Sequence, residues 1–403
     1  MAALAIDVVT LYTFRAEAQR SADAAALVGA KVFVDSGFTS RPCTPPLPAA
    51  IKTLITQQAT AIARQNTVGG QSASFAVTVT FPNETAPNCS NPQVAVDVLR
   101  TNLPIYFARI WSRTLQSVRA TATAEAYNPS NATSGGGGPS VPVAPRCVKP
   151  LLLPNCDPNS ANTSSPPSNC PGGGGGGNSA TLVDAATGAV SNPSVIGFSP
   201  VTRLAAGCAA GGGCTPTTPT AWQYYPLTLP PATNSCPGCA GSGSVGFQHN
   251  LECCNPTPLA CGQTLNFDST INPNGGGGPA TRGGRCMIHQ TGGNSGQDSL
   301  DTSSVPFEFV AGRSNPLIGG GAQNIQSGDD ISTSNSVVTV PMYDGTPVTG
   351  AVRIVGFLQL FISRVHNSGG MDATILNVVG CGAATGTPVV GSGSPVPVRL
   401  IHL

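Results

Sequence analysis

One uninterrupted helical pattern occupies residues 5 to 30, whose sequence is AIDVVTLYTFRAEAQRSADAAALVGA. Its first turns carry almost no charge, and its later turns are amphipathic. The pattern has two parts. One is a stripe at spacings of three and four, formed by Leu4, Val8, Leu11, Tyr12, Arg15 and Gln19. The other is a face of small residues, formed by Ala18, Ala22, Ala25, Ala26 and Gly29. Because small side chains let another element approach closely, this face predicts a packing surface and not a catalytic one.

Two helices are predicted in the first third of the chain. The first extends from about residue 3 to residue 34, and Asp35 to Gly37 ends it. The Pro-rich stretch 42–48 prevents its continuation. A second helix is predicted from Ala49 to Gln65, where apolar residues again recur at helical spacing.

After the second helix, the period of the apolar residues changes from about 3.6 to 2, which indicates strands. The alternating runs are 75–81, 94–98 and 118–126, and the first two are separated by turn residues, as in a hairpin. A short helix is expected from Leu103 to Ile110, with Pro104 tolerated in its first turn. The chain therefore begins with an α+β arrangement of two long helices and a small antiparallel sheet.

Residues 128–145 are predicted to be a linker, because they contain Pro, Ser, Asn and four consecutive glycines. The linker separates a domain at 1–127 from a module at 146–403, which we expect to be mainly β and rich in loops. The strand candidates of this module are Trp222–Leu229, Val305–Val310, Ser336–Met342, Val352–Ile362 and Asp372–Val379. Its one helical candidate is a short turn near Thr281–His289.

Charge excludes one class of partner. Only 9% of the 403 residues are charged, and the formal net charge is +1. A nucleic-acid-binding protein needs a basic face, so we expect no nucleic-acid partner. Few charges together with 49 glycines and 37 prolines suit a surface protein that is rich in strands and turns.

Fourteen cysteines form an even set, and they are Cys43, Cys89, Cys147, Cys156, Cys170, Cys208, Cys214, Cys236, Cys239, Cys253, Cys254, Cys261, Cys286 and Cys381. An oxidising compartment would pair them, whereas a cytosol would keep them reduced. We therefore expect disulfides, with a metal site and free or mixed thiols as the alternatives. Cys236 and Cys239 have zinc-knuckle spacing, but the adjacent pair Cys253-Cys254 cannot form a second knuckle. The four histidines do not cluster at ligand spacing, and they are His249, His289, His366 and His402.

Several motifs could carry chemistry, and each also has a simpler structural interpretation. Asp330 to Ser334 matches the Asp-x-Ser-x-Ser pattern of adhesion metal sites, but no buried parallel strand precedes it, so a polar turn is expected. Gly241 to Ser244 lacks the strand and helix of a nucleophile elbow. Cys286 with His289 is a conceivable nucleophile pair, and Cys236 with Cys239 a conceivable redox pair. We expect no catalytic, cofactor-binding or metal site, and hence no enzyme.

The N-terminal part of the chain also resembles a known family. The run Ile6-Asp7-Val8, then Leu11-Tyr12, Arg15 and Gln19, followed by Ser21 to Ala30, is similar to the N-terminal segment of TadG-like proteins of the Flp (tight adherence) pilus system. Tyr106 to Ala108 and the alternating strand from Val118 also resemble this family, so that the resemblance covers residues 4–127. It implies a pilin-like arrangement, with a sheet packed on a long N-terminal helix.

The resemblance further implies a non-enzymatic component of a pilus assembly or surface-attachment apparatus in the cell envelope, on the extracytoplasmic side. Its partners would be other envelope subunits, bound through the N-terminal helix. In such proteins an apolar membrane segment precedes this motif, so an anchor is expected upstream of Met1. Asp7 would pair with a partner subunit or mark the water boundary. The alternative from a different class is a secreted or surface-displayed binding or adhesin protein unrelated to pili.

Overall fold

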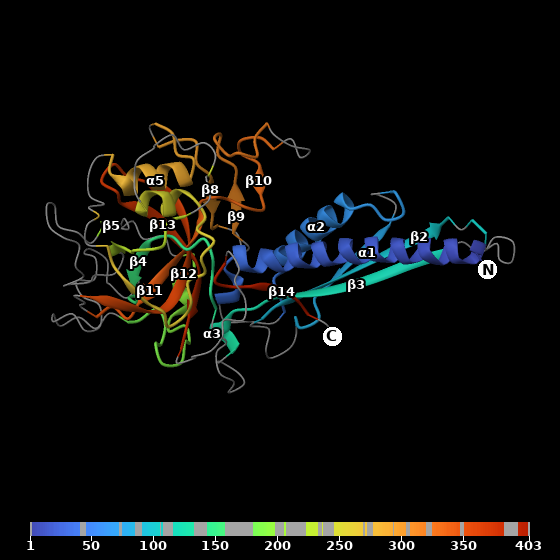
Figure 1. Cartoon of the computed structure of the whole chain (residues 1–403), viewed down its shortest axis with the longest axis horizontal. Coiled ribbons are helices and arrows are strands. Elements are labelled where there is room, and N and C mark those ends of the chain that lie inside the picture. The colour runs from blue at the N-terminus through green and yellow to red at the C-terminus, as the bar shows by residue number, and fades with distance from the viewer. Residues whose placement is uncertain are drawn as a thin grey trace. The chain divides into compact units, whose positions relative to one another are not determined.

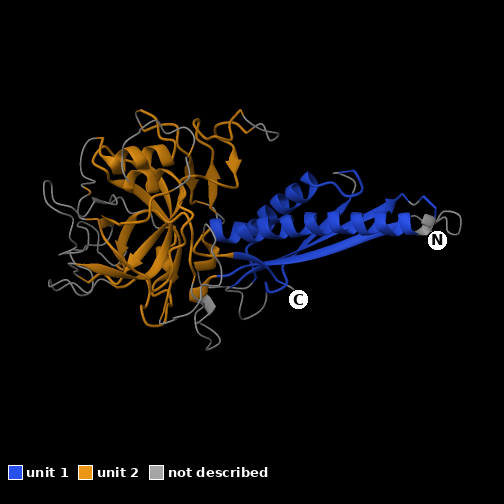
Figure 2. Cartoon of the chain, in the orientation of Figure 1, with its two compact units in different colours: residues 1–35, 43–127, 398–403 blue, residues 36–42, 128–397 orange. Residues whose placement is uncertain are grey.

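The computed structural model of the 403-residue chain resolves into two compact units (Figures 1 and 2). Unit 1 comprises residues 1–35, 43–127 and 398–403, and unit 2 comprises residues 36–42 and 128–397. The residues that the structure describes are 2–40, 46–71, 75–84, 91–104, 106–107, 116–132, 143–157, 180–197, 205–206, 223–232, 236, 246–268, 271, 277–292, 294–303, 307–319, 325–346, 350–382 and 394–401.

Unit 1 is a two-layer arrangement of helices on one antiparallel sheet (Figure 1). Its helices are α1 (Ala2–Asp35) and α2 (Ala49–Gln65). Its sheet has the order β1-β2-β3-β14, and these strands span Ala76–Thr80, Gln93–Leu103, Gln116–Ala126 and Val398–Ile401. Every neighbouring pair is antiparallel. This confirms the predicted α+β class, the long N-terminal helix and the small antiparallel sheet.

The small face of α1 packs onto the sheet and α2, which confirms the predicted packing surface. Ala18, Ala22, Ala25 and Ala26 are fully buried. Val94 and Val96 of β2 are also fully buried, while the alternate residues of the strand are only partly covered. Such alternation is typical of a sheet with one face in the core and one face in solvent. Burial of small side chains therefore fixes the distance between the two layers.

Two features of unit 1 differ from the prediction. The expected helix from Leu103 to Ile110 is wrong at its start, since Leu103 ends β2 and residues 106–107 form a bend; the other residues of that range, apart from Pro104, lie outside the described part. Residues 398–403 were assigned to the C-terminal module, whereas β14 pairs with β3 and belongs to unit 1. A partner so distant in sequence leaves no local signal in a strand of four residues.

Unit 2 is mainly β, as predicted. Its larger sheet has the order β13-β12-β11-β4-β6-β5, with β7 paired to β12, and these strands span Met371–Gly380, Ala351–Val365, Val337–Tyr343, Leu151–Pro154, Gln223–Pro226, Ala205–Ala206 and Thr264–Asn266. Its smaller sheet has the order β10-β9-β8, spanning Asp330–Ile331, Glu308–Val310 and Ser299–Asp301. Short helices complete it, namely η1 (Phe38–Ser40), α3 (Pro129–Ala132), η4 (Pro193–Val195), α4 (Phe247–Glu252) and α5 (Pro279–Met287).

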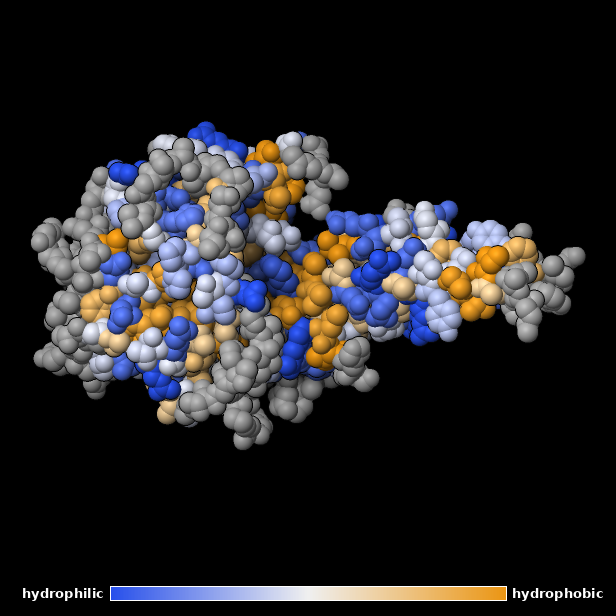
Figure 3. Space-filling model, in the orientation of Figure 1, coloured by the Kyte–Doolittle hydropathy of each residue, from blue (hydrophilic) through white to orange (hydrophobic). Residues whose placement is uncertain are grey.

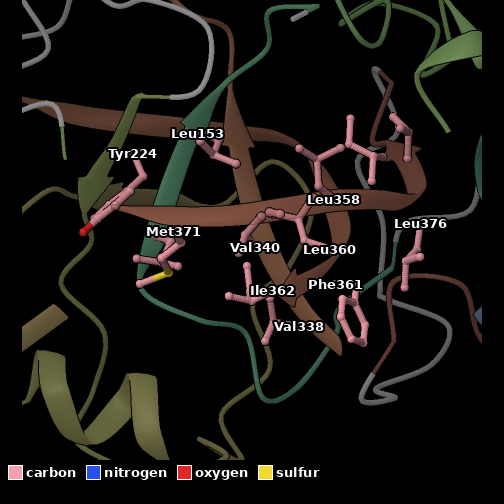
Figure 4. Close-up of a cluster of buried hydrophobic side chains, with 14 of the residues drawn as sticks. Leu153, Tyr224, Val338, Val340, Leu358, Leu360, Phe361, Ile362, Met371 and Leu376 are labelled. Atoms are coloured by element: carbon pink, nitrogen blue, oxygen red, sulfur yellow. The ribbon is translucent and has the colours of Figure 1, made fainter. Parts of the chain in front are cut away.

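The core of unit 2 lies against the long strands β11, β12 and β13 (Figure 4). Leu358, Leu360 and Phe361 of β12 are buried there beside Val340 of β11. Phe309 and Phe361 stack with ring centroids 5.7 Å apart. Long apolar runs are typical of strands that are covered on both faces, which explains why β11, β12 and β13 were predictable from the sequence.

The predicted linker is wrong at its first residues. Asn128 is fully buried within unit 2, and its Nδ2 donates to the carbonyl oxygen of Thr39 over 3.0 Å. Ser130 is also buried, and its Oγ accepts a hydrogen bond of 2.7 Å from the Gly380 backbone nitrogen. Short polar side chains that bond to the backbone anchor this segment, although its composition is that of a linker. Residues 133–142, which include the four glycines, lie outside the described part.

Three disulfides are present among the described residues of unit 2. They join Cys147 to Cys254, Cys236 to Cys253 and Cys261 to Cys381. Cys156 and Cys286 are disulfide-bonded as well. Such pairing points to an oxidising, extracytoplasmic location. Over the described ranges, no helix is both long enough and apolar enough to cross a membrane.

Candidate functional site

The first turns of α1 expose large apolar side chains to solvent. Val9 and Tyr12 are 64% and 69% exposed. We call the surface formed by Ile6, Val8, Val9, Tyr12, Tyr106 and Phe107 the apolar end of unit 1; each of these residues is more than one-third exposed. Figure 3 shows apolar residues gathered toward this end of the unit. A contiguous apolar surface of this kind on a folded protein marks an interaction site.

Asp7 is a buried residue that holds Tyr106 and Phe107 of this surface against α1. Its side chain is 3% exposed, and its two carboxylate oxygens accept hydrogen bonds of 2.9 Å from the backbone nitrogens of Tyr106 and Phe107. Asp7 therefore fastens a distant segment of its own unit to α1. Neither alternative from the sequence, a partner's ion pair or a marker of the water boundary, describes this role. Carboxylate bonds to backbone amides are charge-assisted and stronger than neutral ones.

A groove of about 300 Å³ lies beside α1 in unit 1. It is lined by Val8, Leu11, Tyr12 and Arg15 of α1 and by Ser117, Val118 and Arg119 of β3. The four α1 residues belong to the stripe that the sequence identified, at spacings of three and four. The β3 contribution was missed, since alternation predicts a strand but not which edge of it stays open.

The flanks of the groove carry basic side chains. Arg15 is exposed. Arg119 is also exposed, and its Nε donates to the Asp97 carboxylate over 2.6 Å. Glu17, two residues after Arg15 on α1, is engaged elsewhere, because its Oε2 accepts a bond of 2.8 Å from the Gly69 backbone nitrogen. Because Asp97 balances the charge of Arg119, the groove combines an apolar floor with the positive charge of Arg15 at its margin.

The cysteine-based candidates do not form reactive sites in the structure. Cys236 is bonded to Cys253, so it does not pair with Cys239, which lies outside the described residues. Cys286 is also disulfide-bonded and offers no thiolate to His289. The His289 ring instead hydrogen-bonds to Asn335 over 2.8 Å, and burial lowers the pKa of this histidine.

The Asp-x-Ser-x-Ser motif begins in the short strand β10 and continues into the polar residues that follow it. Asp330 lies in β10 and is exposed. Ser334 donates to the Asp298 carboxylate over 2.5 Å, so its hydroxyl is already committed. Asn315 bonds to the same carboxylate at 2.8 Å. Within the described part of the chain, no group of three His, Cys, Asp or Glu side chains could hold a metal ion. Gly241 to Ser244 lie outside that part.

The structure contains a histidine–carboxylate pair, His366 and Asp372, that the sequence analysis did not predict. His366 Nε2 and Asp372 Oδ1 are 2.8 Å apart, across the hairpin that joins β12 to β13. The hairpin is also held by Thr281, whose Oγ1 donates to the carbonyl of Asn367 over 3.2 Å, and by Tyr224, whose hydroxyl donates to the carbonyl of Gly369 over 2.9 Å. These bonds explain the pair as an anchor of the turn.

Lys149 is a buried cation in unit 2. Burial lowers its pKa to about 8, and Glu252 partly opposes this shift. Its Nζ donates to the Cys253 carbonyl over 2.9 Å, beside the paired cysteines. The bond satisfies one donor of the ammonium group and fixes the lysine in a structural position.

No family model, no curated protein and no solved structure matches this chain.

Proposed function

We propose that this chain is a non-enzymatic, extracytoplasmic component of a bacterial Flp-type (tight adherence) pilus assembly or surface-attachment system. The observation that carries the proposal is the motif from Ile6 to Ala30, which resembles that of TadG-like proteins. Its small residues are the ones buried against the sheet and α2. Its other residues include Ile6, Val8, Val9 and Tyr12, which form the α1 part of the apolar end of unit 1.

Two further observations support this proposal. The disulfides suit a protein that folds outside the cytoplasm. The apolar end supplies a surface for assembly with other envelope subunits, as the resemblance implies. In this function α1 holds unit 1 together along its small face and contacts subunits through its first turns, while unit 2 is displayed on the envelope. The upstream membrane anchor that the resemblance implies belongs to the same proposal.

The test is deletion of the gene, followed by assays of surface attachment and of pili on the cell. We expect both to be lost and to be restored by the intact gene. A Tyr12→Asp variant should fail to restore them, whereas Thr13→Asp, also on an exposed position of α1, should succeed. Normal attachment and pili after deletion, with the protein free in the medium, would instead indicate a secreted binding protein unrelated to pili.

A further inference from the structure

The groove on unit 1 is bordered by a strand edge that is only partly covered. β14 pairs with β3 from Val398 opposite Ala126 to Ile401 opposite Thr123. Among the described strands, none pairs with β3 between Gln116 and Ala122 on the side away from β2. An uncovered edge of this kind presents backbone donors and acceptors in a row.

The direction of the backbone groups along this edge follows from one hydrogen bond. The Ala126 nitrogen donates to the Pro92 carbonyl over 3.1 Å, so the backbone of Ala126 points toward β2. Backbone groups alternate in direction along a strand, so those of Ser117, Arg119 and Thr121 point away from β2. Gln19 agrees with this assignment, because its Nε2 donates to the Thr121 carbonyl over 3.3 Å.

Gln19 thus covers the edge just beyond the end of β14. The next two outward-pointing residues, Arg119 and Ser117, line the groove. Opposite them lie Val8, Leu11 and Tyr12 on α1. From Ser117 to Thr121 the edge is about 13 Å long, at roughly 3.3 Å per residue, which is the length of four to five extended residues.

We propose that this groove is a docking site for an extended segment of a partner protein, which adds a strand to the open edge of β3. Its backbone pairs with Ser117 and Arg119, and every second side chain lies against Val8, Leu11 and Tyr12. The basic margin selects an acidic side chain near Arg15. Strand addition to a sheet edge takes its affinity from main-chain bonds and its specificity from alternate side chains. The inference specifies the partner surface of the function proposed above.

A second copy of this chain fits the groove less well. The opposite edge of the same sheet is β1, and α2 contacts this strand. The outer face of α2 exposes Thr53, Thr56, Gln57 and Arg64. A copy that added through β1 would bring this polar face toward the apolar stripe of α1. An alternating apolar segment with a carboxylate matches the floor and the charge of the groove better.

The first test uses the full chain and two fluorescent peptides of equal composition. Acetyl-Thr-Leu-Thr-Val-Thr-Glu-Thr-amide places Leu, Val and Glu on one face, and acetyl-Thr-Thr-Leu-Val-Thr-Glu-Thr-amide divides the apolar side chains between two faces. We expect the first peptide to bind at least about tenfold more tightly, by fluorescence anisotropy. NMR hydrogen exchange should show new protection at the Ser117 and Arg119 amides and none at Val118 or Ala120. Equal affinity for the two peptides would overturn the proposal.

Variants separate docking from a general loss of folding. Tyr12→Asp should weaken binding about tenfold or more, and Thr13→Asp, which lies outside the groove lining, should not. Arg15→Glu should lose the Glu peptide and gain a Lys analogue of it, a reversal that an unfolded variant could not produce. Self-association of the chain that Tyr12→Asp abolishes would assign the groove to a second copy instead. Tyr12-dependent binding to phosphatidylglycerol vesicles would assign it to lipid. Both outcomes would overturn the proposal, and neither depends on the gene-deletion phenotype.

Discussion

Gly29 of α1 lies directly against Val94 of β2. A Cβ on Gly29 would be 3.0 Å from Cγ1 of Val94, and 3.1 Å from Cγ2 of Ile55 in α2. Both separations are tighter than ordinary contacts, so a larger residue would push the helix away from the sheet. The close approach of these two residues sets the spacing of the layers in unit 1 and makes the small face of α1 testable by substitution.

We expect Ala22→Leu to destabilise unit 1 by about 1–3 kcal/mol, because it overpacks a fully buried position. Ala16→Leu is the matched control, since Ala16 lies on the exposed side of the same helix. Alanine and leucine also have similar helix propensities, so the substitution itself should change helix stability little. Thermal unfolding followed by circular dichroism compares them. Equal stability of the two variants would mean that the alanines reflect helix propensity alone. Glu17 is an unsuitable control, because its carboxylate accepts a hydrogen bond from the Gly69 backbone nitrogen.

Asp7→Ala should free the segment around Tyr106 from α1. The variant loses two backbone hydrogen bonds, each 2.9 Å long. Loss of a bond to a charged group costs about 1.5–3 kcal/mol. Hydrogen exchange at the Tyr106 and Phe107 amides should become faster, while exchange in α2 should not change. Unchanged exchange at these two amides would show that Asp7 does not hold the segment.

Removal of residues 398–403 should destabilise unit 1 and promote aggregation. The deletion uncovers β3 from Thr123 to Ala126 and breaks the ion pair in which Arg399 Nε donates to Glu125 over 2.6 Å. It also removes the Arg399 guanidinium from the face of Tyr127, 4.6 Å from its ring centroid. Newly exposed strand edges favour intermolecular pairing. Size-exclusion chromatography and urea unfolding would measure both effects. Arg399→Ala, which keeps the strand, should lose about 1 kcal/mol or less without aggregation.

The stability of unit 2 should depend on pH through the lowered pKa of Lys149. Its folded-state pKa of about 8 lies below the ordinary value of 10.5, so the unfolded chain binds more protons between these pH values. The free energy of unfolding should therefore rise with pH across this window, and the cost of burying the ammonium is fully present below it. Lys149→Met should lack this rise, which we expect to reach about 1–3 kcal/mol. The comparison needs only the difference in slope between the two proteins, measured by urea unfolding at each pH. Parallel slopes would contradict the assignment.

The disulfide between Cys261 and Cys381 closes a separation of 120 residues. The double substitution Cys261→Ser and Cys381→Ser should lower the free energy of unfolding by about 2–5 kcal/mol, because long closed loops constrain the unfolded chain most.

Alkylation of the purified native protein without reductant, followed by mass spectrometry, should leave most cysteines from Cys147 to Cys286 unlabelled. Extensive labelling would show that the thiols are free.

Local sequence patterns predicted the two long helices and the long strands of this protein, but they did not predict which distant segments pair. The second helix has the predicted bounds, Ala49–Gln65, because its apolar period is regular. The pairing of β14 could not be predicted, since Arg399 and Glu125 are 274 positions apart. The groove shows the same division. Its helical stripe followed from spacing, but its strand edge depends on where β14 ends, which only the fold determines.

The chain order of the two units has a consequence for how such proteins diverge. Residues 128–397 of unit 2 follow β3 in sequence and precede β14, and these two strands are direct neighbours in the sheet of unit 1. The segment is therefore an insertion between two adjacent strands of unit 1. A tight turn could replace it and still join Ala126 to Val398. Evolution could exchange this inserted segment, its cysteines included, while the helices and the sheet of unit 1 are kept.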